Sequence, residues 1–535
     1  MTLERILYYG DNLDILKDHI KTESVDLIYL DPPFNSNVNY NVIFKNKDEK
    51  ESSAQIQAFA DTWKCNAESI ETYYKLKKTP GKIADTIVGF YHILGQSSMM
   101  AYLIMMAIRL IELKRVLKKT GSLYLHCDPT ASHYLKIMLD SLFGPENFRN
   151  EVIWKRTFAH NDPKRFGSIH DTLLFYTKSD DYLWNTEYLP YDESYINNFF
   201  KYNDTFGRYR VVILTAPGTT KSGDSGKPWK GIDPSKIGRH WAVPRIKSLP
   251  KYFKIPKNWE TFSIQQKLDE LDQQKVIYWP KKVGGTPGIK KYLDESLGTL
   301  FQDIIDDIPP LSAQSKERVG YPTQKPLTLL ERIIKASSNE GDVILDPFCG
   351  CGTAIVAAEK LKRRWLGIDV TCLATSLLEF RMHEEFCKRI TVIGVPQNKE
   401  EAQILFDKNP FQFEAWAVSR IKGIHPNQKQ VGDKGIDGQG WIGPKSQYKI
   451  YVSVKGGKNL TPQMLRDLFG TIKRDGAHAG VLLTLHTPTK GMKLEAMSYG
   501  YMESSLSLEY PKIQIFTIED YFEGKLVKLP ENIQL

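Results

Sequence analysis

Residues 343–369 read VILDPFCGCGTAIVAAEKLKRRWLGID, and the pattern within them sets the class of fold. The apolar run 343–345 predicts a buried strand, the Ala-rich segment 353–361 predicts a helix, and 365–370 predicts a second strand. Strand, turn, helix and strand in this order make a βαβ unit. We therefore expect an α/β protein with a parallel sheet.

The turn between the first strand and the helix contains Gly350 and Gly352. Glycine lets the backbone approach a ligand closely. Asp369 follows Asp346 by 23 residues, at the end of the next strand, where an acidic side chain can hydrogen-bond ribose hydroxyls. The turn lacks the three-glycine dinucleotide fingerprint and a phosphate loop, so we expect a nucleoside without phosphates. A glycine pair that only stabilises the turn is the alternative.

The tetrapeptide Asp31-Pro32-Pro33-Phe34 closes the apolar run Val25–Leu30, which predicts a strand. Two prolines stiffen the turn, and the missing N–H of the first lets its carbonyl face outward. The Asp31 carboxylate and the Pro32 carbonyl then offer two acceptors, which match the two N–H groups of an exocyclic amine. Phe34 adds an aromatic face on which a base can stack. An ordinary proline turn is the alternative.

The chain up to about residue 185 alternates strand and helix patterns. Strands are predicted at 121–125 and 172–176, and a helix with a basic end at 103–118. The apolar run 99–108 is too short to span a membrane. The start of the chain shows no signal-peptide pattern, and the six cysteines form no disulfide framework, so we expect a cytoplasmic protein.

The 535 residues predict several domains. Periodicity is weak from about residue 190 to 310, where Gly, Pro, Lys and aromatic residues are frequent, and a polar, charged stretch near residue 400 predicts a linker. We expect residues 1–185 and 311–395 to form the main α/β domain, 186–310 an insert, 396–410 the linker, and 411–535 a second, smaller α/β domain.

Positive charge is concentrated in the predicted insert. The whole chain has a net charge of +9, whereas residues 201–257 alone contain thirteen Lys and Arg against three Asp. Aromatic residues are interleaved with these charges. Such a stretch predicts a polyanionic partner, and a solvated basic loop is the alternative.

These motifs resemble those of the amino-methylating DNA methyltransferases that use S-adenosylmethionine. Asp31–Pro32–Pro33–Phe34 is similar to their catalytic motif and residues 346–353 to their cofactor motif. The catalytic motif comes first here, as in the circularly permuted β class. Residues 321–326, YPTQKP, are similar to the family's His-Pro-Thr-Gln-Lys-Pro motif, with Tyr321 in place of His. The resemblance implies a Rossmann-like methyltransferase fold with a target-recognition region in residues 186–310.

The resemblance also implies direct methyl transfer to adenine N6 in double-stranded DNA, within restriction-modification or defence. Cytosine N4 is the alternative, although Asp at position 31 favours adenine. The residues implied in catalysis are Asp31, Pro32, Pro33 and Phe34. Those implied in binding S-adenosylmethionine are Asp11, Thr323, Lys325, Asp346, Phe348, Cys349, Gly350, Gly352, Thr353 and Asp369. Because β-class enzymes are often dimers, a homodimer is the implied assembly.

The predicted second domain carries Glu414, then Asp437, and then Lys455 at the end of the apolar run Tyr448–Lys455. Acidic residues with a lysine on the next strand are typical of a metal-dependent nuclease. This part resembles the Mrr-like restriction endonucleases, which implies Mg²⁺ at Glu414 and Asp437 with Lys455 beside it. That family usually has Glu or Gln where this chain has Ser453, a poorer Mg²⁺ ligand. Cutting of DNA and DNA binding without cutting therefore both stay open.

Two other functions are weighed against DNA methylation. In the first, the nuclease is the working part and the first domain is a methylation-sensing DNA-binding module. In the second, the methylated substrate is RNA or protein. The intact Asp31-Pro32-Pro33-Phe34 and the glycine turn argue against the first, and the large basic insert favours duplex DNA over the second.

Overall fold

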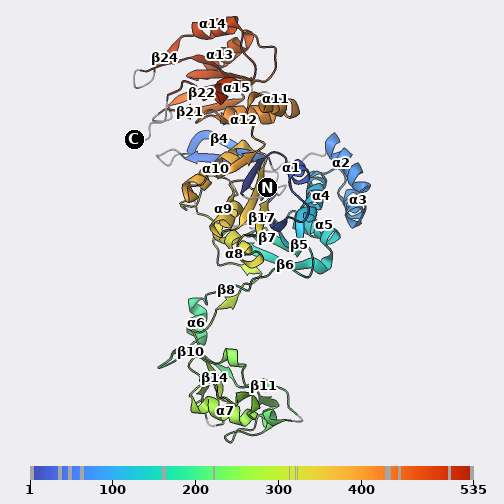
Figure 1. The fold of residues 1–535 in the computed structure, drawn as a ribbon, viewed down its shortest axis with the longest axis vertical. Coiled ribbons are helices and arrows are strands. Elements are labelled where there is room, and N and C mark those ends of the chain that lie inside the picture. The colour runs from blue at the N-terminus through green and yellow to red at the C-terminus, as the bar shows by residue number, and fades with distance from the viewer. Residues whose placement is uncertain are drawn as a thin grey trace. The chain divides into compact units, whose positions relative to one another are not determined.

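A computed structural model describes residues 5–530 except 34–38, 46–50, 61–65, 160–163, 221–222, 283, 313, 320, 322, 428–434, 444–446 and 504–507. The chain divides into two compact units (Figure 1). The first contains Met1–Asn185 and Asp303–Leu535, and the second contains Thr186–Gln302. The second unit is thus inserted into the chain of the first.

A nine-stranded sheet lies at the centre of the first unit, in the order β16-β6-β7-β5-β2-β17-β18-β1-β19. Its strands from β5 to β19 run parallel, whereas β7 is antiparallel to both β5 and β6. The strands are β1 (Ile6–Tyr9), β2 (Val25–Leu30), β5 (Leu117–Cys127), β6 (Phe148–Lys155), β7 (His170–Thr177), β16 (Ile304–Ile305), β17 (Val343–Asp346), β18 (Arg364–Asp369) and β19 (Thr391–Ile393). The predicted α/β class is confirmed.

Strand β2 lies beside β17, although more than 300 residues separate them in the chain. Leu27 pairs with Ile344 and Ile28 with Leu345. Because the two strands are parallel, their carboxyl ends meet at one edge of the sheet. The sheet therefore brings the end of β2, where Asp31 lies, next to the glycine turn that follows β17.

Both faces of the sheet are covered by helices, and side chains alternate between two cores along each strand. Ile28 and Leu30 of β2 join the core beneath one set of helices, whereas Leu27 and Tyr29 join the other core. The first set is α1 (Asn12–His19), α2 (Ala67–Lys77), α3 (Lys82–Leu94), α4 (Ser98–Val116) and α5 (Ser132–Phe143), and the second is α8 (Leu327–Ser337), α9 (Thr353–Lys360) and α10 (Cys372–Phe386). A separate ribbon pairs β3 (Asn39–Lys45) with β4 (Glu51–Ala60).

The helix predicted over residues 103–118 is α4, and its predicted bounds are wrong at both ends. It begins at Ser98, where the Ser97 side chain accepts a hydrogen bond from the Met100 N–H, and it ends at Val116. Lys118 belongs to β5 instead. Buried residues lie all around α4, so its sequence has no polar face that would mark where it starts. No helix in the described parts of the chain is long and apolar enough to cross a membrane.

The inserted unit has its own fold, although the sequence there predicts little regular structure. A four-stranded antiparallel sheet runs in the order β13-β14-β10-β9. Its core contains Trp229, Trp241, Trp259 and Leu268, residues too far apart in the chain to show a period. The elements are β8 (Tyr188–Leu189), α6 (Glu193–Phe199), β9 (Tyr202–Asp204), β10 (Gly207–Ile213), β11 (Thr215–Pro217), β12 (Arg239–Trp241), α7 (Ile264–Gln273), β13 (Ile277–Tyr278), β14 (Gly288–Tyr292) and β15 (Thr299–Leu300).

The C-terminal part of the first unit contains a five-stranded sheet in the order β20-β21-β22-β23-β26. The residues predicted as a linker, 396–410, contain a helix that starts after Asn398 and packs Ala402 into the core of this part. The elements are α11 (Lys399–Lys408), α12 (Pro410–Ser419), β20 (His425–Pro426), β21 (Gly438–Ile442), β22 (Tyr448–Lys455), α13 (Gln463–Asp475), β23 (Ala479–Thr484), α14 (Lys490–Ser498), β24 (Tyr501–Glu503), β25 (Glu509–Pro511), β26 (Ile513–Thr517) and α15 (Ile518–Phe522).

Candidate active site

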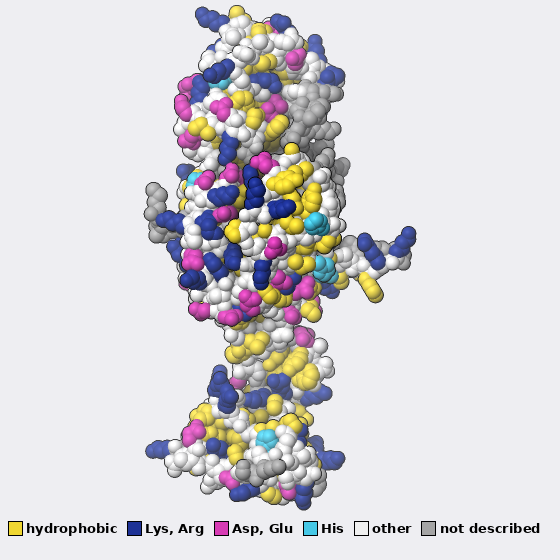
Figure 2. Space-filling view, turned by 90° about the vertical axis from the view of Figure 1, so that its right-hand side faces the viewer, with side chains coloured by type: hydrophobic (Ala, Val, Ile, Leu, Met, Phe, Trp, Pro, Cys, Tyr) yellow, Lys and Arg dark blue, Asp and Glu magenta, His cyan; other side chains and the backbone are white. Residues whose placement is uncertain are grey.

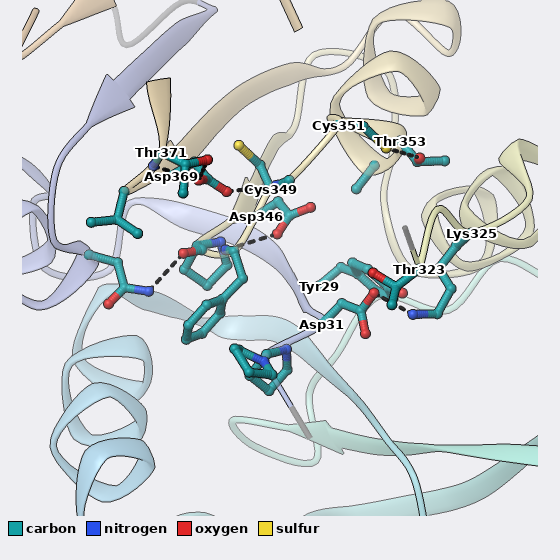
Figure 3. Close-up of a pocket in the computed structure, with 18 of the residues that line it drawn as sticks. Tyr29, Asp31, Thr323, Lys325, Asp346, Cys349, Cys351, Thr353, Asp369 and Thr371 are labelled. Carbon is teal, nitrogen blue, oxygen red and sulfur yellow. Dashed lines mark hydrogen bonds and ion pairs between the residues drawn. The ribbon is translucent and has the colours of Figure 1, made fainter. Parts of the chain in front are cut away.

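A cavity of about 430 Å³ lies at the carboxyl ends of β1, β2, β17 and β18. In a parallel sheet this edge is where ligands bind, because the loops that leave the strands meet there. Its wall comes from residues 10–12, 29, 31–33, 105, 109, 321, 323–325, 330, 346–351, 353–354 and 369–371. Figure 3 shows several of these side chains directed toward a common space.

Most of the site residues predicted from the sequence lie in this one wall. They are Asp31, Pro32 and Pro33, together with Asp11, Thr323, Lys325, Asp346, Phe348, Cys349, Gly350, Thr353 and Asp369. Gly352 is not in the wall, and Phe34 lies outside the described residues. The wall also contains Asn12, Tyr29, Met105 and Arg109, which the sequence motifs do not include.

The glycine turn after β17 is held in one conformation. Gly350 and Gly352 both have positive φ, +48° and +75°. A Cβ on Gly352 would lie 2.3 Å from Leu378 Cδ1, so this position needs glycine for packing and not only for its dihedral angles. The Gly350 N–H donates to Asp369 Oδ2 at 2.8 Å. The turn is therefore fixed against β18 before any ligand arrives.

A buried carboxyl group, Asp346, and a partly buried one, Asp369, flank this turn. Burial raises the pKa of Asp346 well above its ordinary value, and the nearby carboxylates of Asp31 and Asp369 raise it further. Burial also raises the pKa of Asp369, although the Thr371 backbone N–H and hydroxyl both donate to its Oδ1 at 2.9 Å and 2.8 Å. A ligand that brings N–H or O–H donors, or positive charge, would offset the cost of burying these groups.

A second cluster closes the side of the cavity near β1. Asp11 caps α1 by accepting from the Leu13 N–H at 2.7 Å, and Arg109 Nη2 of α4 donates to its carboxylate at 2.8 Å. Arg109 Nε also donates to Asn12 Oδ1, and Asn12 Nδ2 donates to the Pro347 carbonyl at 2.8 Å. These bonds tie the start of α1, α4 and the glycine turn together. The only signal for Arg109 in the sequence is a charge at the end of an apolar run.

Asp31 lies at the opposite side of the cavity and is paired with a lysine from a distant segment. Lys325 Nζ donates to Asp31 Oδ2 at 2.5 Å, and the two side chains are only 8% and 17% exposed (Figure 3). Tyr29 lies two residues earlier on β2, so both side chains project on the same side of the strand. A carboxylate with one oxygen engaged can still accept through its other oxygen.

Behind Tyr29 lies a buried polar chain that no sequence motif marks. Its hydroxyl lies 2.9 Å from His126 Nδ1, and His126 Nε2 lies 3.1 Å from Asp171 Oδ2. Burial raises the pKa of Asp171, but the His126 hydrogen bond and the electrostatic interactions with His126, Lys325 and Arg156 hold it below its ordinary value. The chain therefore contains an ionised carboxylate that fixes the orientation of His126 and, through it, of Tyr29.

The predicted nuclease site in the C-terminal part looks different. Asp437 Oδ2 accepts from the Val454 N–H at 2.6 Å and from Ser453 Oγ at 3.3 Å, and it lies 3.8 Å from Lys455 Nζ. Glu414 lies on helix α12. No group of three His, Cys, Asp or Glu side chains that could hold a metal ion occurs among the described residues. The Mg²⁺ site expected at Glu414 and Asp437 stays a prediction.

Two family models match two different parts of the chain. The sequence model of the DNA methylase family matches residues 25–372. A second model, described as restriction endonuclease, matches residues 407–502. The first match covers the inserted unit, seven of the nine strands of the large sheet and most of the cavity wall, whereas β1, β19 and residues 10–12 lie outside it.

Among curated proteins, the Type II methyltransferase M.EcaI of Enterobacter cloacae is 32% identical over 275 residues, which are 51% of this chain and 56% of that protein. The StyLTI Mod subunit of Salmonella typhimurium, from a Type III restriction-modification enzyme, is 26% identical over 367 residues, 66% of this chain and 49% of that protein. The chain thus spans about half the length of these relatives. A putative DNA modification methylase of Thermus thermophilus, solved with S-adenosyl-L-methionine, aligns with 72% of this chain and 97% of its own at 16% identity and a TM-score of 0.33.

Proposed function

The chain belongs to the DNA methylase family, and we propose that it transfers a methyl group from S-adenosylmethionine to adenine N6 in DNA. One observation carries the proposal. The Asp31-Pro32-Pro33 turn and the glycine turn 346–353, which lie far apart in the sequence, line the same 430 Å³ cavity. One of them suits an exocyclic amine and the other a nucleoside.

The residues of the cavity fit S-adenosylmethionine as the cofactor. Its adenosine offers ribose hydroxyls, for which the Asp369 carboxylate at the end of β18 is a suitable acceptor. Its amino group and sulfonium carry positive charge, which would relieve the burial of Asp346. Apolar side chains such as Met105 and Phe348 complete the wall. When bound, this cofactor supplies an electrophilic methyl group.

We assign to Asp31 the role of orienting the target amine. One of its oxygens accepts a hydrogen bond from Lys325 Nζ. We propose that the other oxygen accepts a hydrogen bond from one N–H of the amine. The Pro32 carbonyl would accept a hydrogen bond from the second N–H. Two acceptors on the N–H groups would aim the nitrogen lone pair away from Asp31, toward the cofactor side of the cavity. Most of the rate then comes from positioning, since a fixed attack geometry is itself worth several orders of magnitude.

DNA is proposed as the substrate because the inserted unit is strongly basic. Residues 201–257 carry thirteen Lys and Arg against three Asp, and Lys and Arg side chains project from several sides of this unit in Figure 2. Contacts of such cations with phosphates would make binding strongly dependent on salt concentration. We assign target recognition to this unit.

Adenine is favoured by Asp at position 31, and cytosine N4 offers the same exocyclic amine. A homodimer is proposed from the resemblance, and exposed apolar side chains such as Ile93 on α3 and Ile137 on α5 would suit a contact between copies. Sedimentation of the purified chain tests the dimer.

The experiment that tests the function is expression of the full chain in a bacterial strain that lacks DNA methylation of its own. Its genomic DNA is hydrolysed to nucleosides for mass spectrometry, and the modified sites are mapped by sequencing. N6-methyladenine at one recurring sequence is the expected result. N4-methylcytosine would keep the chemistry and correct the base. DNA without any methylated base, from cells that contain the soluble protein, would contradict the proposal.

For the C-terminal part, the Asp437–Lys455 pair and the match to restriction endonucleases favour contact with DNA as a second activity. The described residues contain no group of three side chains that could hold a metal ion, so we derive no cleavage step from them. We propose instead that Lys455 contacts a DNA phosphate.

A further inference from the structure

The loop that joins β6 to β7 leaves the sheet at the same edge as the catalytic turn. The two strands end in the pair Lys155 and His170. Strand β7 is antiparallel to β5, and Thr172 near its start pairs with Cys127, the last residue of β5. Since β5 is parallel to β2, the loop emerges at the carboxyl edge, where Asp31 lies.

The order of the strands places this loop on one particular side of Asp31. The cofactor turns follow β17 and β18, on one side of β2, whereas β5, β7 and β6 lie on the other side. Neighbouring strands are ~4.8 Å apart, so β7 lies ~10 Å from β2. The loop therefore borders the site on the side away from the cofactor, from which a base must enter.

The root of the loop is tied to the wall of the cavity. The Arg156 N–H donates to the Ile169 carbonyl at 3.0 Å, which closes the base of the loop. Arg156 Nε lies 3.2 Å from Asp171 Oδ1, and Asp171 is the carboxylate that holds His126 against Tyr29. The positions of the loop root and of the cavity wall are thus set by one connected polar chain.

The described part of the loop exposes apolar and basic side chains. Phe166 is fully exposed, at 101%, and Phe158 is 70% exposed. Lys164 and Arg165 directly precede Phe166, and residues 156–169 contain three Lys or Arg against one Asp. A fully exposed phenylalanine contributes nothing to the core of the protein. A ring that directly follows two cations, in a loop that leaves the catalytic edge, suits a partner with both stacked rings and negative charge, which is the chemistry of duplex DNA.

We infer that Phe166 is a wedge residue, which enters the base stack beside the target base when that base is extruded into the cavity. This inference rests on the proposed methylation of DNA. Extrusion breaks base pairing and stacking, and apolar side chains inserted between base steps are a known way to stabilise such a distortion. Phe166 supplies the ring that replaces the lost stacking partner, and Lys164 and Arg165 lie where they can meet the adjacent phosphates.

The test separates extrusion of the base from the methyl transfer that follows it. Phe166→Ala, Phe166→Leu and the wild type are compared in single-turnover methylation of a duplex that carries the site mapped in the expression experiment. A second duplex has the same site with an abasic position opposite the target, which makes extrusion easy. The matched control is Phe380→Ala, since Phe380 is a phenylalanine of α10 that is 60% exposed.

We expect Phe166→Ala to slow methylation of the paired duplex by ~10- to 100-fold, because much of the stacking that offsets extrusion is lost. On the abasic duplex its rate should return to within a few-fold of the wild type. Phe166→Leu should lie between the two, and Phe380→Ala should match the wild type on both duplexes.

Two results would overturn the inference. One is a Phe166→Ala rate equal to that of the wild type on the paired duplex, and the other is an equal loss on both duplexes. Both leave methylation by the wild type in place. A wild type that methylates neither duplex would instead contradict the proposed function itself.

Discussion

Asp31 and Asp437 each lie beside a lysine, and their surroundings differ. Asp31 Oδ2 accepts from Lys325 Nζ at the wall of a 430 Å³ cavity, to which other parts of the chain contribute further polar groups. Asp437 Oδ2 receives the Val454 N–H and the Ser453 hydroxyl from the neighbouring strand, with Lys455 Nζ at 3.8 Å. The first pair borders an open space, whereas Oδ2 of the second carboxylate is held by the neighbouring strand β22.

An acidic residue with a nearby lysine therefore does not define a reaction site by itself. A reaction site needs lone pairs or donors that remain directed at a cavity. At Asp31 the partner comes from a segment 294 residues away, and the turn that carries Asp31 lines the cavity. At Asp437 the partners come from one adjacent strand, an arrangement that also stabilises an ordinary strand pair.

The largest expected effect is that of Asp31→Asn on methylation. The substitution keeps the size of the side chain and replaces a charged acceptor by an amide, so the target amine loses its orientation. We expect kcat to fall by ~10³-fold, as for the loss of a central polar group in other active sites. Single-turnover transfer of a labelled methyl group at saturating cofactor measures it. Asp437→Asn is the matched control, and equal losses in the two variants would remove the distinction between the sites.

The second effect concerns stability. Lys325→Met leaves the largely buried Asp31 carboxylate without its cation, and breaking a buried pair from one side costs ~3 kcal/mol. The free energy of unfolding, measured in urea, should fall by about that amount. The double variant Asp31→Asn/Lys325→Met should recover most of the loss, because no unpaired charge remains. A double variant less stable than Lys325→Met would contradict this account of the pair.

The third effect compares two glycines. Gly352→Ala would place a methyl group 2.3 Å from Leu378 Cδ1 at a φ of +75°, so we expect a loss of ~2 kcal/mol in stability and weaker binding of S-adenosylmethionine. Gly457→Ala, in the loop after β22, meets nothing within 4 Å and should change stability by less than ~0.5 kcal/mol. Denaturation in urea and calorimetry with the cofactor check both. Similar losses would show that the cofactor turn is not specially constrained.

The fourth effect is the pH dependence of stability. Burial, with the charges of Asp31 and Asp369, raises the pKa of Asp346, so the folded chain keeps a proton that the unfolded chain releases above ~pH 4. Without cofactor, Asp346 should therefore lower the free energy of unfolding as pH rises above ~4, by up to ~1.4 kcal/mol per pH unit. Asp346→Asn should flatten this slope. An unchanged slope in that variant would show that another group causes it.

The smallest expected effect is that of Mg²⁺ on the C-terminal part. Since the described residues there hold no group of three metal-ligating side chains, adding Mg²⁺ or EDTA should move Tm by less than ~1 °C. Lys455→Ala should weaken binding of non-specific DNA by a few-fold and leave methylation of the mapped site unchanged. A Tm increase with Mg²⁺ that disappears in Asp437→Asn would show that the metal binds there after all.

The sequence predicted the parts of the site whose residues are contiguous. The glycine turn, Asp369 and Asp31 each follow an apolar run, and the end of a strand is visible in the sequence as a change from apolar to polar residues. Gly352 shows the limit of this reasoning. Two glycines in one turn look alike in sequence, and only the packing shows that Gly350 faces the cavity while Gly352 faces Leu378.

The rest of the site depends on contacts between elements that are distant in the chain. Arg109 meets Asn12 across 97 residues, and His126 meets Asp171 across 45. The sequence around a single buried histidine, or around an arginine at the end of an apolar run, does not indicate which distant residue it contacts. The core of the inserted unit could not be predicted for the same reason, because Trp229, Trp241 and Trp259 are not spaced with a helix or strand period in the sequence.

The most direct test of the account uses the purified full chain, plasmid DNA and S-adenosylmethionine whose transferable methyl group carries deuterium. Mass spectrometry of the nucleosides should show N6-methyladenine heavier by the full label, from the wild type and not from Asp31→Asn. That result would place both the donor and the amine at the cavity described above. Labelled N6-methyladenine formed equally by Asp31→Asn, or no labelled nucleoside from a wild type that binds the cofactor, would contradict it.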